Sequence, residues 1–161
     1  MKYLLVVGVQ QMAVQPHSSR FVLLSHTLER INVLIRLLRK KEYTVVFSQY
    51  ISEQMGETSW DAQIAADIRE GDAVISHMGA NPFFKSQLQT ELALASTVII
   101  CGAHTNIAVR DAACTLSDMG KQVVVVSDCC SASSPNVHQF TLEDLSHSRK
   151  NVRVCSLQEL S

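Results

Sequence analysis

Histidine and cysteine are the residues of this sequence whose chemistry suits a reactive site. His77 follows a short apolar run, and His104 lies in a turn within residues 98–109. An imidazole titrates near neutral pH, so either histidine could act as a general base or as a contact for a ligand. For His77 the alternative is a hydrogen-bonded histidine that fills space at the end of a strand. The residue type does not decide between these interpretations.

The five cysteines offer a second kind of chemistry, because a thiolate is a good nucleophile. Cys101 ends an apolar run, which favours an inert, buried thiol over a nucleophile. Cys129 and Cys130 are adjacent, which leaves a redox or partner-docking role open, although adjacent cysteines rarely meet disulfide geometry. The others are Cys114 and Cys155, and no spacing of the zinc type occurs. We predict reduced thiols in a cytoplasmic protein and no metal site.

The stretch 98–109 must position the chemistry around it. It begins with an unbroken apolar run, which is typical of a parallel strand covered on both faces, and continues through Gly102 into a helix. Thr105 or Asn106 is expected to cap that helix. Ligands of open α/β sheets bind beyond the carboxyl ends of the strands. We therefore expect a crevice at this turn.

Strand and helix patterns alternate along the chain. Strands are predicted at residues 3–9, 43–48, 73–77, 97–101, 122–127 and 151–155. Helices are predicted at residues 25–41, from Asn81 and Pro82 to about 95, from the turn to before Gly120, and from Ser134 and Pro135 to about 147. Residues 49–72 are expected to form a long loop with a short helical piece. This alternation predicts a three-layer α/β/α domain with a parallel sheet, spanning residues 1–161 as a single domain.

Composition excludes several classes of function. The 161 residues carry a net charge of −1, and the basic run at residues 39–41 ends a predicted helix, so a nucleic-acid partner is not expected. The apolar start is too short for a signal peptide, and no stretch reaches transmembrane length, so we expect no membrane partner. Charged residues make up only 18% of the chain, which favours an oligomer.

Three motifs occur in the order and spacing of a known family. Gly8, Val9 and Gln10 end the first strand, Gln49 and Tyr50 end the second, and residues 101–109 form a strand-to-helix turn. Together they resemble the isochorismatase-like cysteine hydrolases, in their small, metal-free branch. The resemblance implies a six-stranded sheet of order 3-2-1-4-5-6, a homodimer or higher oligomer, and a cis peptide bond between Ala103 and His104.

The resemblance also implies three catalytic positions. The family uses an Asp after the first strand, a Lys after the third and a Cys at the start of the fourth-strand helix, where the Cys is readily ionised. The matching residues here are Gly8, His77 and Ala108, which supply neither an acid nor a nucleophile. The metal-binding Asp and His of the nicotinamidase branch have no counterparts, and no cofactor is expected.

We therefore predict a catalytically degenerate member that binds a small molecule or a partner at the remnant crevice. The alternative is a hydrolase of a small amide or ester in which His77 or His104 acts as a base toward water, which requires a partner that orients the histidine. Phe83 is open to two interpretations, a role in the core and a role in the pocket. The candidate pocket residues are Gln10, Tyr50, His77, Phe83, His104 and Asn106.

Overall fold

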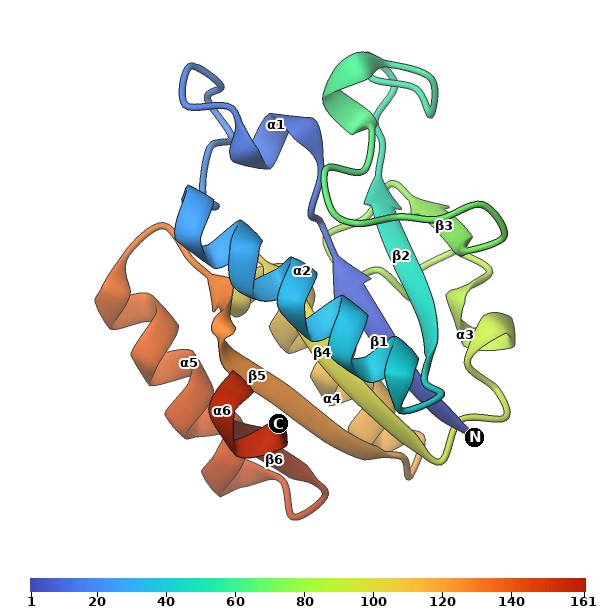
Figure 1. Ribbon diagram of the computed structural model, residues 1–161, viewed down its shortest axis with the longest axis vertical. Coiled ribbons are helices and arrows are strands. Elements are labelled where there is room, and N and C mark those ends of the chain that lie inside the picture. The colour runs from blue at the N-terminus through green and yellow to red at the C-terminus, as the bar shows by residue number, and fades with distance from the viewer.

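A six-stranded sheet forms the centre of the protein, which is described by a computed structural model of residues 1–161. All neighbouring strands pair in parallel, in the order β3-β2-β1-β4-β5-β6 (Figure 1). The predicted fold class and strand order are thus confirmed. The strands are β1 (Lys2–Val7), β2 (Thr44–Tyr50), β3 (Ala73–His77), β4 (Thr97–Ala103), β5 (Gln122–Ser131) and β6 (Val152–Cys155).

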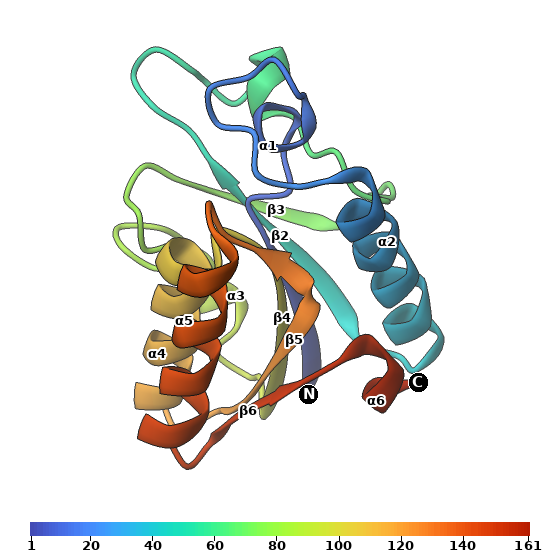
Figure 2. The same cartoon turned by 90° about the vertical axis from the view of Figure 1, so that its left-hand side faces the viewer.

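Helices cover both faces of the sheet, as Figure 2 shows edge-on. One face carries α2 (Ser25–Lys40) and α6 (Leu157–Leu160), and the other carries α3 (Leu88–Glu91), α4 (Arg110–Asp118) and α5 (Pro135–Ser148). Beyond the carboxyl ends of the strands lie α1 (Gln11–Val14) and the 3₁₀ turn η1 (Trp60–Ala62), and the π-helical turn η2 (Thr105–Val109) leads into α4. No helix in the chain combines the length and the apolar content needed to cross a membrane.

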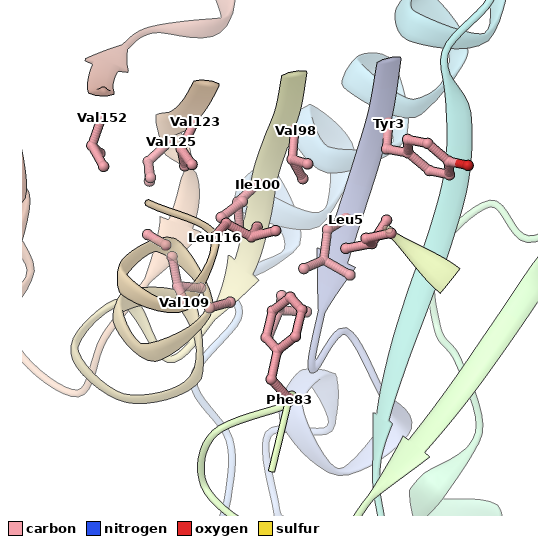
Figure 3. Packing of buried hydrophobic residues seen from close by; sticks show 14 of the residues in the cluster. Tyr3, Leu5, Phe83, Val98, Ile100, Val109, Leu116, Val123, Val125 and Val152 are labelled. Atoms are coloured by element: carbon pink, nitrogen blue, oxygen red, sulfur yellow. The ribbon is translucent and has the colours of Figure 1, made fainter. Parts of the chain in front are cut away.

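Strand β1 divides the core into two layers. Its side chains alternate between the faces, as they must in any strand. Leu5 and Val7 enter the cluster beneath α4, whereas Leu4 and Val6 enter the cluster beneath α2. Figure 3 shows Leu5 and its neighbours from β4 and β5 packing toward Leu116 of α4. Because β1 is buried on both faces, its sequence reads as an unbroken apolar run.

The predicted helix from Pro82 to about residue 95 is wrong in extent, because only α3 is helical there. Asn81 does begin a turn, and its Oδ1 accepts a hydrogen bond from the Phe83 N–H at 3.0 Å. Lys85 then adopts a φ of 48°, which lies outside the right-handed helical region and interrupts the segment. By contrast, Ser134 caps α5 as predicted, since its hydroxyl accepts from the Val137 N–H.

We predict that Leu34→Ala lowers the free energy of unfolding by about 2–5 kcal/mol, because it opens a cavity in the layer beneath α2. Leu34 is 0% exposed and sits on the apolar face of that helix. The matched control is Val33→Ala on the same helix, where the residue is 44% exposed and the expected change is within about 0.5 kcal/mol. Urea denaturation measures both values. Equal losses in the two variants would contradict this assignment of the buried face.

Candidate functional site

A cavity of about 290 Å³ lies at the carboxyl ends of the central strands. Its lining is mainly apolar and comes from segments far apart in the chain. Gly8 follows β1, His77 ends β3, His104 follows β4, and Ala108 lies in η2. The three positions that the resemblance singled out, Gly8, His77 and Ala108, therefore meet at one cavity.

A side chain at Gly8 would be strained and would collide with the backbone. Its φ is 63°, a conformation that L-residues rarely adopt. A Cβ atom at this position would lie 2.5 Å from the carbonyl oxygen of Ala103, which belongs to the adjacent strand β4. The obstacle is backbone rather than a flexible side chain, so this edge of the cavity is built around glycine.

His77 is held in a fixed orientation. The residue is 4% exposed, and its Nδ1 lies 2.9 Å from the carbonyl oxygen of Gly79. A carbonyl oxygen only accepts, so Nδ1 donates the proton and Nε2 carries the lone pair. Nε2 is buried and has no hydrogen-bond partner. The imidazole ring packs edge-on against the Tyr50 ring, with 5.9 Å between the ring centroids. Burial lowers the pKa of His77, against a smaller opposing effect of the Gly79 bond. The imidazole is therefore neutral at pH 7.

Gln10 lines the cavity but uses its amide to hold the backbone. Its Nε2 donates to the carbonyl oxygens of Tyr50 and Ala62, and its Oε1 accepts from the Tyr50 N–H, each at 2.9 Å. These three bonds tie the end of β1 to β2 and to η1. Gln10 is fully buried, so its role is to fix the rim of the cavity.

Gln49 does not fit a metal centre. Its Nε2 donates to the carbonyl oxygens of Glu57 and Ala62, and its Oε1 accepts from the Ser76 hydroxyl. The amide is thus engaged with the protein on both sides. No group of three or more His, Cys, Asp or Glu side chains in the chain is arranged to hold a metal ion. The residues present here offer none of the donor sets that divalent metals prefer.

The turn after β4 differs from the predicted cap. The peptide bond between Ala103 and His104 is cis, as the resemblance implied. The prediction that Thr105 or Asn106 caps the helix is wrong, because His104 is the N-cap residue and no side chain caps the turn. The Thr105 hydroxyl instead lies 2.7 Å from Nδ1 of His138 on α5, and Oδ1 of Asn106 is buried without a partner.

His104 and His138 are both partly buried, and burial lowers the pKa of each. His104 lines the cavity, but its ring forms no hydrogen bond that would orient it. His138 lies on α5. Helical periodicity could not reveal its contact with Thr105, which is 33 residues away in sequence.

Four of the six candidate pocket residues line the cavity, namely Gln10, Tyr50, His77 and His104. Phe83 and Asn106 do not. Phe83 lies in the core beneath α4, near Leu5, as Figure 3 shows. The core interpretation of Phe83 therefore holds.

Several lining residues were missed because they belong to loops without a recognisable pattern. Arg20 and Val22 return to the cavity from the segment between α1 and α2, and Met78 and Ala80 follow β3. Residue types gave no signal for them. The sequence indicated only that the strands end at one edge of the sheet, so that loops following them would lie near the cavity.

The cysteines lie outside the cavity lining. Cys101 is fully buried, and desolvation raises its pKa well above the ordinary value. Burial likewise raises the pKa of Cys129, and that of Cys130 to about 12. All five thiols are free, with no disulfide among them. The surroundings of Cys101, Cys129 and Cys130 suppress thiolate formation, so they argue against nucleophilic or redox chemistry at these three residues.

We predict that Cys114 alone reacts promptly with a thiol reagent in the native protein at pH 8. It is partly exposed, whereas the other four cysteines are buried. Mass spectrometry after brief iodoacetamide treatment measures the labelled positions, with urea-unfolded protein as the reference for complete labelling. Prompt native labelling of Cys101 or Cys129 would contradict the burial described above.

We predict that the free energy of unfolding falls as the pH drops below about 6.5. The lowered pKa values of His77, His104 and His138 mean that the unfolded chain binds more protons than the native protein in that range. His77→Gln should make the acid loss shallower, whereas His147→Gln at an exposed position should not. Urea denaturation between pH 5 and 8 measures the slopes. An unchanged slope in His77→Gln would contradict a neutral, buried His77.

Comparison with known proteins agrees with this architecture. The family model described as the isochorismatase domain matches residues 2–159. The "Uncharacterized isochorismatase family protein YecD" of Escherichia coli O157:H7 is 24% identical over 134 residues, which cover 79% of this chain and 70% of that protein.

Solved structures share the fold. An isochorismatase family protein from Desulfovibrio vulgaris superposes with a TM-score of 0.90 at 18% identity, covering 99% of this chain and 95% of its own. A cysteine hydrolase from Pseudomonas syringae gives 0.87 at 17% identity, with coverage of 99% and 90%. A zinc-bound pyrazinamidase of Pyrococcus horikoshii gives 0.87 at 20% identity, with coverage of 96% and 98%. Because the family model matches nearly the whole sequence, this chain belongs to the isochorismatase family.

Proposed function

We propose that this protein is a catalytically degenerate member of its family that binds a small molecule in the cavity without hydrolysing it. The observation that carries the proposal is the collision that a side chain at Gly8 would make with the Ala103 carbonyl oxygen. The family's acid has no place there. A second observation supports the proposal: no cysteine is among the residues that line the cavity.

The other two family positions support the same proposal. Ala108 presents a methyl group where the family has a nucleophile, and His77 presents a neutral ring where the family has a cation. Members of a nucleophile-and-base unit act together, so the loss of one usually costs several orders of magnitude in rate. With all three replaced, the family's reaction has no starting thiolate and no carboxylate to exchange protons with it.

Ligand binding is supported by the cavity itself. Its volume of about 290 Å³ is at the lower end of the range for small-molecule sites, which is roughly 300–1,000 Å³. The walls are mostly apolar, with a few polar groups, as such sites usually are. Ala108, which has only a methyl group where the family has a longer side chain, leaves part of that space open.

A hydrolase with histidine-based chemistry is the second candidate, and one observation favours it. The Gly79 carbonyl orients His77 and leaves Nε2 unprotonated, as a general base requires. Against it, Nε2 is buried without a partner, so a water molecule would need a local shift to reach it. His104 lacks any orienting partner.

Hydrolysis assays separate the two candidates. On a panel of small amides and esters, we expect the wild type to match His77→Gln and the buffer control. The matched control variant is His147→Gln, on the exposed side of α5. Turnover by the wild type that His77→Gln loses and His147→Gln keeps would overturn the degenerate assignment and select the histidine-based hydrolase.

A further inference from the structure

Arg20 is the only charged side chain that lines the cavity. The lining includes no Asp or Glu, and both of its histidines have pKa values lowered by burial. The cavity therefore carries one positive charge and no negative charge at pH 7. A cationic ligand would be repelled by Arg20, and no carboxylate in the lining would attract it.

The guanidinium of Arg20 contacts two side chains of the cavity wall, but no carboxylate pairs with its charge. Its central carbon lies 5.1 Å from the centroid of the Tyr50 ring, a cation–π arrangement, and Nη1 lies 4.0 Å from Sδ of Met12. Both partners also line the cavity. Arg20 forms no salt bridge, whereas Arg39 and Arg149 each pair with a carboxylate. Most of its N–H donors thus remain available.

The rest of the cavity suits an apolar body. Ten of its sixteen lining residues are hydrophobic. The amide of Gln10 is already engaged by backbone groups, so it offers a ligand little. Tyr50 and His77 add aromatic surface, and Met12 and Met78 add thioethers that pack well against rings.

The geometry points to a small monocarboxylate with an apolar, ring-sized body as the ligand of this cavity, with Arg20 binding its carboxylate. This inference rests on the proposed function, because it names the ligand class of the same site. A planar guanidinium pairs with a carboxylate through two parallel hydrogen bonds. One guanidinium compensates one negative charge, so a dianion would keep an unpaired charge against apolar walls.

Benzoate and benzamide make a matched pair of probes, because they share a ring and differ in charge. Ligand-observed NMR titration of the wild type should give benzoate an affinity at least about tenfold above that of benzamide, the effect of one charge-assisted pair. Arg20→Gln should abolish that preference. Arg20→Lys should keep part of the preference for benzoate, because an ammonium group retains the positive charge but cannot form two parallel hydrogen bonds to a carboxylate. The control Arg153→Gln removes an equal charge at an exposed position on β6 and should have no effect.

The outcomes separate this inference from the function on which it rests. Equal binding of the two probes without turnover would overturn the carboxylate ligand and leave a degenerate binding site in place. A benzoate preference that survives Arg20→Gln, or no benzoate binding up to about 10 mM, would also overturn the inference. Conversion of benzamide to benzoate by the wild type would overturn the degenerate function instead.

Discussion

The close approach of β1 and β4 at their carboxyl ends is the constraint on which the site depends. At Gly102 a Cβ would lie 1.9 Å from the Val7 carbonyl oxygen, and at Gly8 a Cβ would lie 2.5 Å from that of Ala103. At these two positions the backbone conformation would direct a side chain into the neighbouring strand, so only glycine fits without strain. Val7, Gly8 and Ala103 line the cavity at this contact, and His104 follows Ala103 directly.

The electrostatics of the site follow from how deeply its groups are buried. Desolvation keeps His77 and His104 neutral and raises the pKa of Cys101. The amide of Gln10 is satisfied by backbone groups. Arg20 alone brings a full charge to the lining. Such a site is suited to selecting a ligand by shape and by one charge, rather than to generating a nucleophile.

The sequence predicted the fold well because strong local patterns agreed with one another. Apolar runs located all six strands, and the amphipathic pattern of α2 located that helix to within one residue. The helix after Pro82 failed because Lys85 leaves the helical region, which its residue type does not signal. The order of the strands came from the family resemblance, since periodicity carries no information on which strands are neighbours.

The site was only partly predictable, for a related reason. Residues at strand ends, such as His77 and His104, could be placed at the crevice because parallel strands end at one edge. Arg20 could not, because it reaches the cavity through a loop. No local sequence pattern could predict two other features, because each arises between segments far apart in the chain. These are the contact of Thr105 with His138 and the collision that a side chain at Gly8 would make with Ala103.

The most direct test of this account is the free energy of unfolding of Gly8→Asp and Gly8→Ala compared with Gly120→Ala. Gly120 also has a positive φ, of 78°, but a Cβ there meets nothing within 4 Å. All three variants should lose about 1–2 kcal/mol to the backbone conformation, and the Gly8 variants should lose a further 1–3 kcal/mol or more to the collision with Ala103. Equal losses at the two positions would show that position 8 can accept the family's acid. That result would contradict a site built around glycine.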